Sequence, residues 1–216
     1  MVIRNLNSFD PSVMAFEPPV KNGDVYFSKA RYNSRSLLFQ SDLIYFRSFE
    51  NGKLKILLSK KMFQFMTKIE RQTIELISEH SEKWFNMKLT IDQVRQIYKS
   101  SLIFPSGEPN SVLTEINSIE EPMVFNSHEK KIKLEDFKKD TPIIILARLK
   151  GITFYRSNCI PNWEFLSVKS KVVLMENKCI INSDSDESEN ETQKQNQNEN
   201  QNENEKMVKV INFENN

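Results

Sequence analysis

Aromatic and basic side chains alternate in three segments of this 216-residue sequence. A β-strand places side chains two positions apart on one face, so such a segment presents rings and cations together. Cations bind phosphates and rings stack on bases, which is the combination that binding of single-stranded nucleic acid requires. The segments are residues 25–32 (VYFSKARY), 43–49 (LIYFRSF) and 147–156 (ARLKGITFYR), and a basic run, VKSKV, follows at 168–172.

The alternation also assigns individual side chains to this chemistry. We predict that Tyr45, Arg47 and Phe49 share one face of their strand, and that Arg148 and Lys150 share another. Packing in the core is the alternative for each ring taken singly. The predicted phosphate-binding residues are Arg47, Arg148, Lys150, Arg156, Lys169 and Lys171, and the predicted stacking rings are Tyr45, Phe154, Tyr155 and Trp163.

The remaining pattern predicts the helices and turns that must position these side chains. Residues 60–84 carry apolar side chains at three- and four-residue steps, which is typical of an amphipathic helix. Thr90 and Gln93 have the spacing of a capping box and predict a second, short helix. Asn51 and Gly52 predict a tight hairpin turn, and residues 105–109 (PSGEP) predict a break.

The rest of residues 1–181 has the pattern of short strands. Many short strands with a helical insertion at about 60–99 favour an α+β fold, mainly antiparallel, arranged as a barrel or a sandwich. Strands and helices do not alternate regularly, so a parallel nucleotide-binding sheet is not predicted. The predicted strands are residues 25–32, 36–40, 43–49, 53–59, 112–116, 131–134, 143–150, 152–156 and 163–175.

Charge divides the chain into a basic body and an acidic tail. Residues 1–181 contain 27 basic and 20 acidic residues, whereas residues 182–216 contain 3 and 9. Residues 183–205 have no aliphatic or aromatic side chain, so we expect disorder there. Such a tail would compete with nucleic acid for a basic face, and Phe213 near its end would offer partner proteins an apolar contact. The alternative is a low-complexity insertion followed by a last strand.

Patterns for catalysis, metals and membranes are weak. The sequence has no glycine-rich phosphate loop and no nucleophile-elbow motif. Its two cysteines, Cys159 and Cys179, match no metal-ligand spacing with His80 or His128, so we expect buried thiols and predict no metal, cofactor or enzymatic activity. The longest apolar run, 143–147, is far shorter than the roughly 20 residues of a membrane helix. Since no signal-peptide pattern is present either, we expect an intracellular protein, cytoplasmic or nuclear.

Four short motifs between residues 36 and 172 resemble those of a known family. They are SLLFQ at 36–40, KWFN at 83–86, T-x-D-x-V at 90–94 with Tyr98, and L-x-G-I-x-F at 149–154 with Trp163. Their order is similar to that in single-stranded-DNA-binding proteins of large eukaryotic DNA viruses, of the African swine fever virus type. The resemblance implies an oligonucleotide-binding (OB-type) barrel that coats single-stranded DNA at the viral replication site, without sequence specificity and without catalysis.

Two other functions fit the same residues. A structural or scaffold protein, such as a virion or assembly component, would use the β-rich body to bind protein and the tail as a spacer. An RNA-binding module would need the same rings and cations as a DNA-binding one. Clustering of the predicted cations on one sheet face would favour nucleic-acid binding, whereas scattered cations would favour the scaffold.

Overall fold

The structure is a computed structural model, and it describes residues 2–171. They form a mixed β-sheet with two α-helices and three short 3-10 helices, at Leu6–Ser8, Pro11–Val13 and Leu134–Asp136. The predictions for the tail at 182–216 with Phe213, for Cys179 and for strand residues 172–175 lie outside the described residues.

Eleven strands make up the sheet in the described part of the chain. The predicted strand at 25–32 is confirmed without change, and those at 36–40, 43–49 and 53–59 are confirmed with small shifts at their ends. The strands are β1 (Val2–Ile3), β2 (Met14–Phe16), β3 (Val20–Asn22), β4 (Val25–Tyr32), β5 (Leu37–Gln40), β6 (Ile44–Glu50), β7 (Lys53–Leu57), β8 (Leu102–Ile103), β9 (Leu113–Phe125), β10 (Pro142–Phe154) and β11 (Cys159–Ser170).

Five of these strands pair in a closed circuit. β6 pairs with β7 on one side and with β10 on the other, through Tyr45 opposite Pro142 and Ile44 opposite Ile143. From β7 the pairing continues through β9 and β11 back to β10. The β9–β11 pair is parallel and the other four are antiparallel. Each strand of the circuit therefore has one inner face and one outer face.

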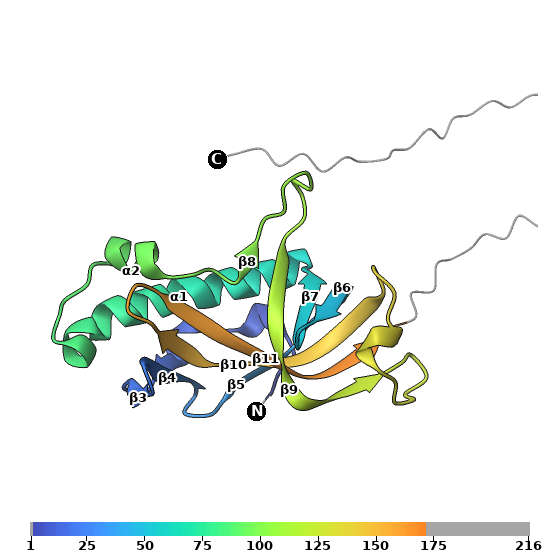
Figure 1. The fold of residues 1–216 in the computed structure, drawn as a ribbon, viewed down its shortest axis with the longest axis horizontal. Helices are drawn as coiled ribbons and strands as arrows, with labels where there is room; N and C mark the ends of the chain where they lie inside the picture. Colours follow the sequence, from blue (N-terminus) through green and yellow to red (C-terminus); the bar gives the residue numbers. More distant parts are fainter. Residues whose placement is uncertain (1, 172–216) are drawn as a thin grey trace, which may run out of the picture. The chain divides into compact units, whose positions relative to one another are not determined.

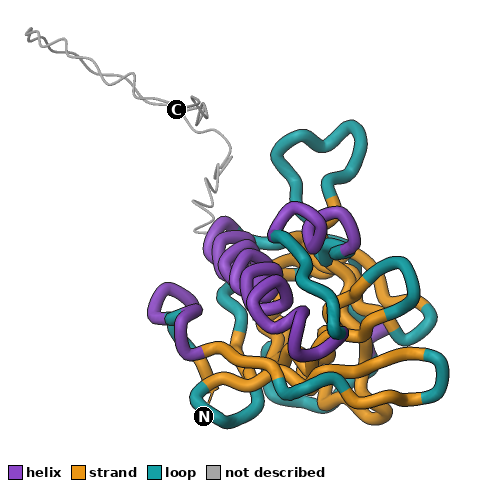
Figure 2. The backbone as a smooth tube through the Cα atoms, turned by 90° about the vertical axis from the view of Figure 1, so that its left-hand side faces the viewer, coloured by secondary structure: helices purple, strands orange, loops and turns teal. Residues whose placement is uncertain are grey.

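The helix predicted at 60–84 is confirmed as α1 (Lys60–Phe85). Ser59 begins it by accepting a hydrogen bond from the Met62 amide (3.0 Å), and Asn86 ends it in a left-handed conformation. Its apolar stripe packs on the sheet, where the ring centroids of Phe65 and Phe39 lie 4.9 Å apart. Figures 1 and 2 show α1 along one side of the strands. The helix therefore covers the core-facing side of β5, on which Phe39 lies.

The second helix and the tight turn also follow the sequence prediction. α2 (Ile91–Ile97) begins with the capping box. The backbone amide of Gln93 donates to the Thr90 hydroxyl, and the backbone amide of Thr90 donates to the side-chain carbonyl of Gln93. Asn51 and Gly52 both have positive φ, and they join β6 to β7 with Glu50 opposite Lys53. These features depend on neighbouring residues alone, so sequence sufficed to predict them.

The predicted strand at 131–134 is wrong. Lys131 forms one isolated bridge with Phe125 and the Ile132 amide donates to the Val124 carbonyl (3.0 Å), but a 3-10 helix, Leu134–Asp136, follows at once. The Asn126 side chain accepts hydrogen bonds from the amides of His128 and Lys130, which stabilises a turn in place of a ladder.

The break predicted between 143–150 and 152–156 is also wrong, because β10 runs continuously through Gly151. A Cβ atom at this position would lie 2.1 Å from the Ser28 carbonyl oxygen and 2.7 Å from the Phe27 ring. The glycine therefore permits close approach of β4 to β10 and does not end the strand.

Candidate nucleic-acid interface

The alternation along β10 and β11 separates a core face from an exposed one. Ile143, Ile145 and Leu149 of β10 point inward and are buried, and Phe165 and Val168 of β11 are buried in the same way. The intervening residues point outward and are partly exposed. Strand register extends this surface to β4, β5, β6 and β9. We call it the outer face: Phe27, Lys29, Leu38, Gln40, Tyr45, Met123, Phe125, Ile144, Leu146, Arg148, Lys150, Thr153, Glu164, Ser167, Lys169 and Lys171.

Register places rings beside cations on this face. Lys169 lies between Ile144 and Phe125, because it pairs with the first in β10 and the second in β9. The Lys171 amide donates to the carbonyl of Pro142 (2.9 Å), which pairs with Tyr45 across β6. The outer face therefore has an aromatic ring on each side of its two terminal lysines.

Glu164 holds two of the predicted phosphate-binding residues together. Its Oε2 accepts hydrogen bonds from Arg148 Nε (2.9 Å) and Nη2 (2.7 Å), and its Oε1 accepts one from Lys150 Nζ (3.1 Å). Burial alone would raise the pKa of Glu164, but these hydrogen bonds outweigh it and leave the pKa below its ordinary value. Glu164 is therefore ionised at neutral pH and neutralises part of the positive charge beside it.

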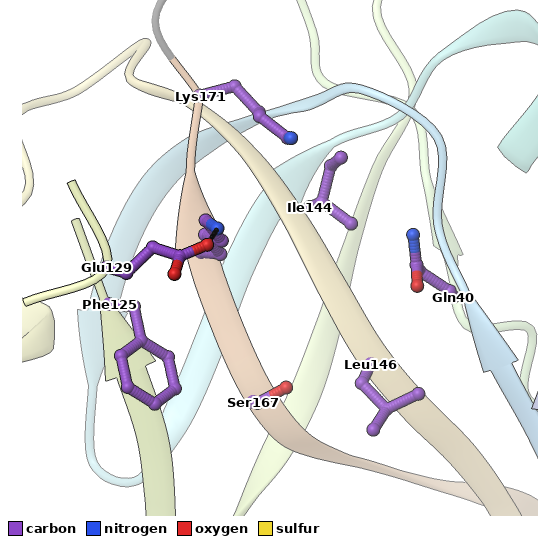
Figure 3. A pocket seen from close by; sticks show the side chains of 8 residues that line it. Gln40, Phe125, Glu129, Ile144, Leu146, Ser167 and Lys171 are labelled. Carbon is purple, nitrogen blue, oxygen red and sulfur yellow. Dashed lines mark hydrogen bonds and ion pairs between the residues drawn. The ribbon is translucent and has the colours of Figure 1, made fainter. Parts of the chain in front are cut away.

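The other end of the face is a hollow of about 560 Å³ between β9, β10 and β11. Figure 3 shows Phe125 and Glu129 on one side of it, Gln40 and Leu146 on the other, and Lys171 at one end. Glu129 accepts a hydrogen bond from the Lys169 ammonium, and this bond lowers the pKa of Glu129. With Lys29, the outer face and its rim carry five basic side chains against two carboxylates.

The structure brings together five of the ten residues predicted from sequence. Arg148, Lys150, Lys169 and Lys171 lie on the outer face, and the prediction that the first two share a face is confirmed. Tyr45 lies at the end of the face and is 38% exposed.

Two predicted stacking rings belong to the core. Trp163 is 2% exposed and Phe154 is 7% exposed. The Trp163 indole donates to the Ser101 hydroxyl (2.9 Å) and its ring meets Phe39 edge-on, while Phe154 packs against Phe85. Neither ring has a free surface for a base, so core packing is correct for both. The reason is that both occupy inward positions of the alternation.

The predicted common face of Tyr45, Arg47 and Phe49 is wrong, because a β-bulge interrupts β6. Phe46 pairs with Ile56 and Ser48 with Lys55, so Arg47 between them has no partner in β7. The extra residue reverses the alternation and turns Phe49 inward, toward Phe165.

Arg47 also lies apart from the four clustered cations. Its side chain is only 17% exposed and pairs with Asp140 (2.9 Å) and Glu108 (3.6 Å). A phosphate at this position would have to displace two carboxylates.

Tyr155 and Arg156 lie in the turn between β10 and β11, at the opposite end of β10 from the hollow. The Tyr155 amide donates to the Asn158 carbonyl, and the Tyr155 side chain is 49% exposed. They can contact a strand that extends along β10, but they are not part of the hollow.

Sequence reasoning missed Phe125, Gln40, Phe27 and Lys29 as members of the face. Phe27 and Lys29 were inside a segment recognised for alternating rings and cations, so that signal was present. Phe125 and Gln40 had none, because only cross-strand register places them beside β10 and β11.

Two absences hold for the described residues. Residues 2–171 contain no group of three or more His, Cys, Asp or Glu side chains that could bind a metal ion. No helix among them is long and apolar enough to cross a membrane. Cys159 is buried, as expected, and burial raises the pKa of its thiol to about 12.

Comparison with protein families assigns the chain to one of them. The model of the Family of unknown function (DUF5871) matches residues 44–179, more than half of the sequence. The chain belongs to this family. The matched region includes all five strands of the circuit, from β6 to β11. The sequence has no significant match among curated proteins.

Solved structures with a related arrangement include phage proteins. The single-stranded DNA-binding protein from bacteriophage Enc34, in a C-terminal truncation, covers 73% of this chain and 95% of its own at 11% identity, with a TM-score of 0.44. Its complex with ssDNA covers 73% and 96% at 13% identity and a TM-score of 0.40. Gp2.5, a single-stranded DNA binding protein encoded by bacteriophage T7, covers 64% and 87% at 10% identity and a TM-score of 0.45.

Proposed function

We propose that this chain binds single-stranded DNA on its outer face, without sequence specificity and without catalysis. The observation that carries the proposal is the gathering of Arg148, Lys150, Lys169 and Lys171 on one face, with the rings of Tyr45 and Phe125 beside the two lysines. Rings that stack and cations that bind phosphate are the two requirements for holding a single strand. Clustering of these four cations is the outcome that favours nucleic-acid binding over a scaffold.

The strand circuit supports the proposal at the level of architecture. An OB fold is a five-stranded, partly open barrel that binds oligonucleotides on its surface. We infer an OB-like barrel from the circuit β6–β7–β9–β11–β10, with β5 extending the outer face next to β10. The setting that we propose, DNA replication of a large eukaryotic DNA virus, rests on the motif resemblance between residues 36 and 172.

The acidic segment at 182–216 is proposed to compete with DNA for the outer face. Its charge of −6 opposes that of the basic body, and bound DNA would have to displace it. Removing 182–216 is therefore expected to tighten DNA binding, most strongly at low salt. Phe213 is proposed as the contact for replication proteins.

Fluorescence anisotropy with single-stranded DNA, single-stranded RNA and duplex DNA of equal length tests the proposal directly. Binding of oligo-dT that weakens steeply with salt, and exceeds duplex binding, is expected. If neither the full chain nor the chain without 182–216 binds oligo-dT at about 50 mM salt, the proposal is wrong. Equal or tighter binding of RNA would assign the outer face to RNA.

One observation favours a protein-binding scaffold as the second candidate. A hollow of about 780 Å³ at β9 is lined by apolar residues, among them Phe49 and Ile132, and by three glutamates, Glu120, Glu121 and Glu135, against one lysine, Lys133. An apolar surface with an acidic rim fits a basic protein segment better than a nucleic acid. Absence of nucleic-acid binding in the anisotropy experiment would favour this function.

A further inference from the structure

The hollow at the Lys169–Lys171 end of the outer face has the form of a small-ligand site. Its volume of about 560 Å³ falls within the ~300–1,000 Å³ that is usual for such sites. Ile144 and Leu146 of β10 give it an apolar floor, and the Phe125 ring from β9 stands at its side (Figure 3). A flat apolar group would bury its faces there.

Polar groups of the hollow are available for hydrogen bonds. Within residues 2–171, neither the Gln40 amide nor the Ser167 hydroxyl forms a side-chain hydrogen bond. The amide offers donors and an acceptor, and the hydroxyl offers both as well. A ligand whose edge carries mixed donors and acceptors is therefore satisfied in more than one orientation.

Two ammonium groups border the same space. Lys169 and Lys171 line the hollow, and Glu129 is the one carboxylate among its lining residues. An occupant should therefore be flat and apolar in its faces, polar at its edge, and linked to negative charge. A nucleobase in a sugar-phosphate chain has all three properties.

We propose that this hollow holds one unstacked base of the bound strand. The base packs against Phe125 with its edge toward Gln40 and Ser167, and the adjoining phosphates bind Lys169 and Lys171. Because both polar side chains donate and accept, purines and pyrimidines are both satisfied, in keeping with binding that ignores sequence. The inference rests on the proposed function and assigns the position of a base within it.

The test compares two ligands with the full chain: an oligo-dT of about ten nucleotides and a strand of equal length made of abasic sites. Phe125→Ala is expected to weaken oligo-dT binding by roughly 5- to 150-fold, which corresponds to the loss of one stacked base. The same variant should bind the abasic strand as the wild type does, since that strand has no base to stack. Phe125→Trp should retain oligo-dT binding because it retains a ring.

Phe104→Ala is the matched control, since Phe104 is an exposed aromatic residue (67%) that contacts Phe63 of α1, outside the outer face. It should alter the binding of neither ligand. Equal weakening of both ligands by Phe125→Ala, or no weakening of either, overturns the base site while leaving single-strand binding in place. A wild type that binds neither ligand overturns the proposed function and the base site with it. A concentration-dependent dimer that Phe125→Ala abolishes, with oligo-dT binding unchanged, would instead assign the hollow to a second copy of the chain.

Discussion

Replacing Lys169 and Lys171 together by alanine tests whether the outer face is where phosphates bind. For single strands, each phosphate contact contributes about −0.7 to the slope of log Kobs against log salt concentration. Five contacts, from Lys29, Arg148, Lys150, Lys169 and Lys171, give at most about −3.5 for the wild type. Losing two contacts should reduce the slope to about −2.1.

These slopes predict different losses of affinity in one titration. Between 50 and 200 mM salt, the wild type should weaken by about 130-fold and the double variant by about 20-fold. Anisotropy of labelled oligo-dT over this range measures both. The slopes are upper limits, because Lys169, Arg148 and Lys150 must exchange Glu129 or Glu164 for phosphate.

Lys68→Ala with Lys83→Ala provides the matched control. Both lysines are exposed on α1, away from the outer face, and their loss changes the net charge of the protein by the same amount. The control should keep the wild-type slope. If both double variants lower the slope equally, the effect belongs to net charge and the assignment of phosphates to the outer face is refuted.

Three further expectations follow from the geometry. Glu164→Gln removes a negative charge next to Arg148 and Lys150, so at low salt it should tighten oligo-dT binding by roughly fivefold, about 1 kcal/mol; weaker binding by a folded variant would mean instead that Glu164 positions the two cations. The folded-state pKa of Glu164 is lowered, so its ion pairs stabilise the protein above the ordinary carboxyl pKa of 4.5, and this stabilisation is lost as the pH falls through the folded-state value. The free energy of unfolding measured in urea should therefore fall more between about pH 5 and 3 in the wild type than in Glu164→Gln. Parallel pH profiles of the two proteins would contradict the assignment. Gly151→Ala should destabilise the fold by about 1–3 kcal/mol or more, since the added Cβ meets the Ser28 carbonyl at 2.1 Å; an unchanged unfolding midpoint in urea would contradict this close approach.

Sequence alone was sufficient for three structures that depend on near neighbours. Periodicity predicted α1, the Thr90–Gln93 pair predicted the start of α2, and Asn51-Gly52 predicted the hairpin. Alternation also predicted that Arg148 and Lys150 share a face, and both side chains do pair with Glu164, although Lys150 has no partner in β11. These signals act over a few residues and do not require knowledge of the partner strands.

Only the tertiary structure decided which face of each strand meets solvent. One unpaired residue at Arg47 turned Phe49 into the core, and inward positions buried Trp163 and Phe154, although their composition suited stacking. Cross-strand register then brought Phe125 of β9 next to Lys169 of β11, 44 positions later in the sequence. The types and order of the residues thus determined which rings and cations are available, whereas bulges and strand register determined which of them form the site, because they fix the side of the sheet to which each side chain points.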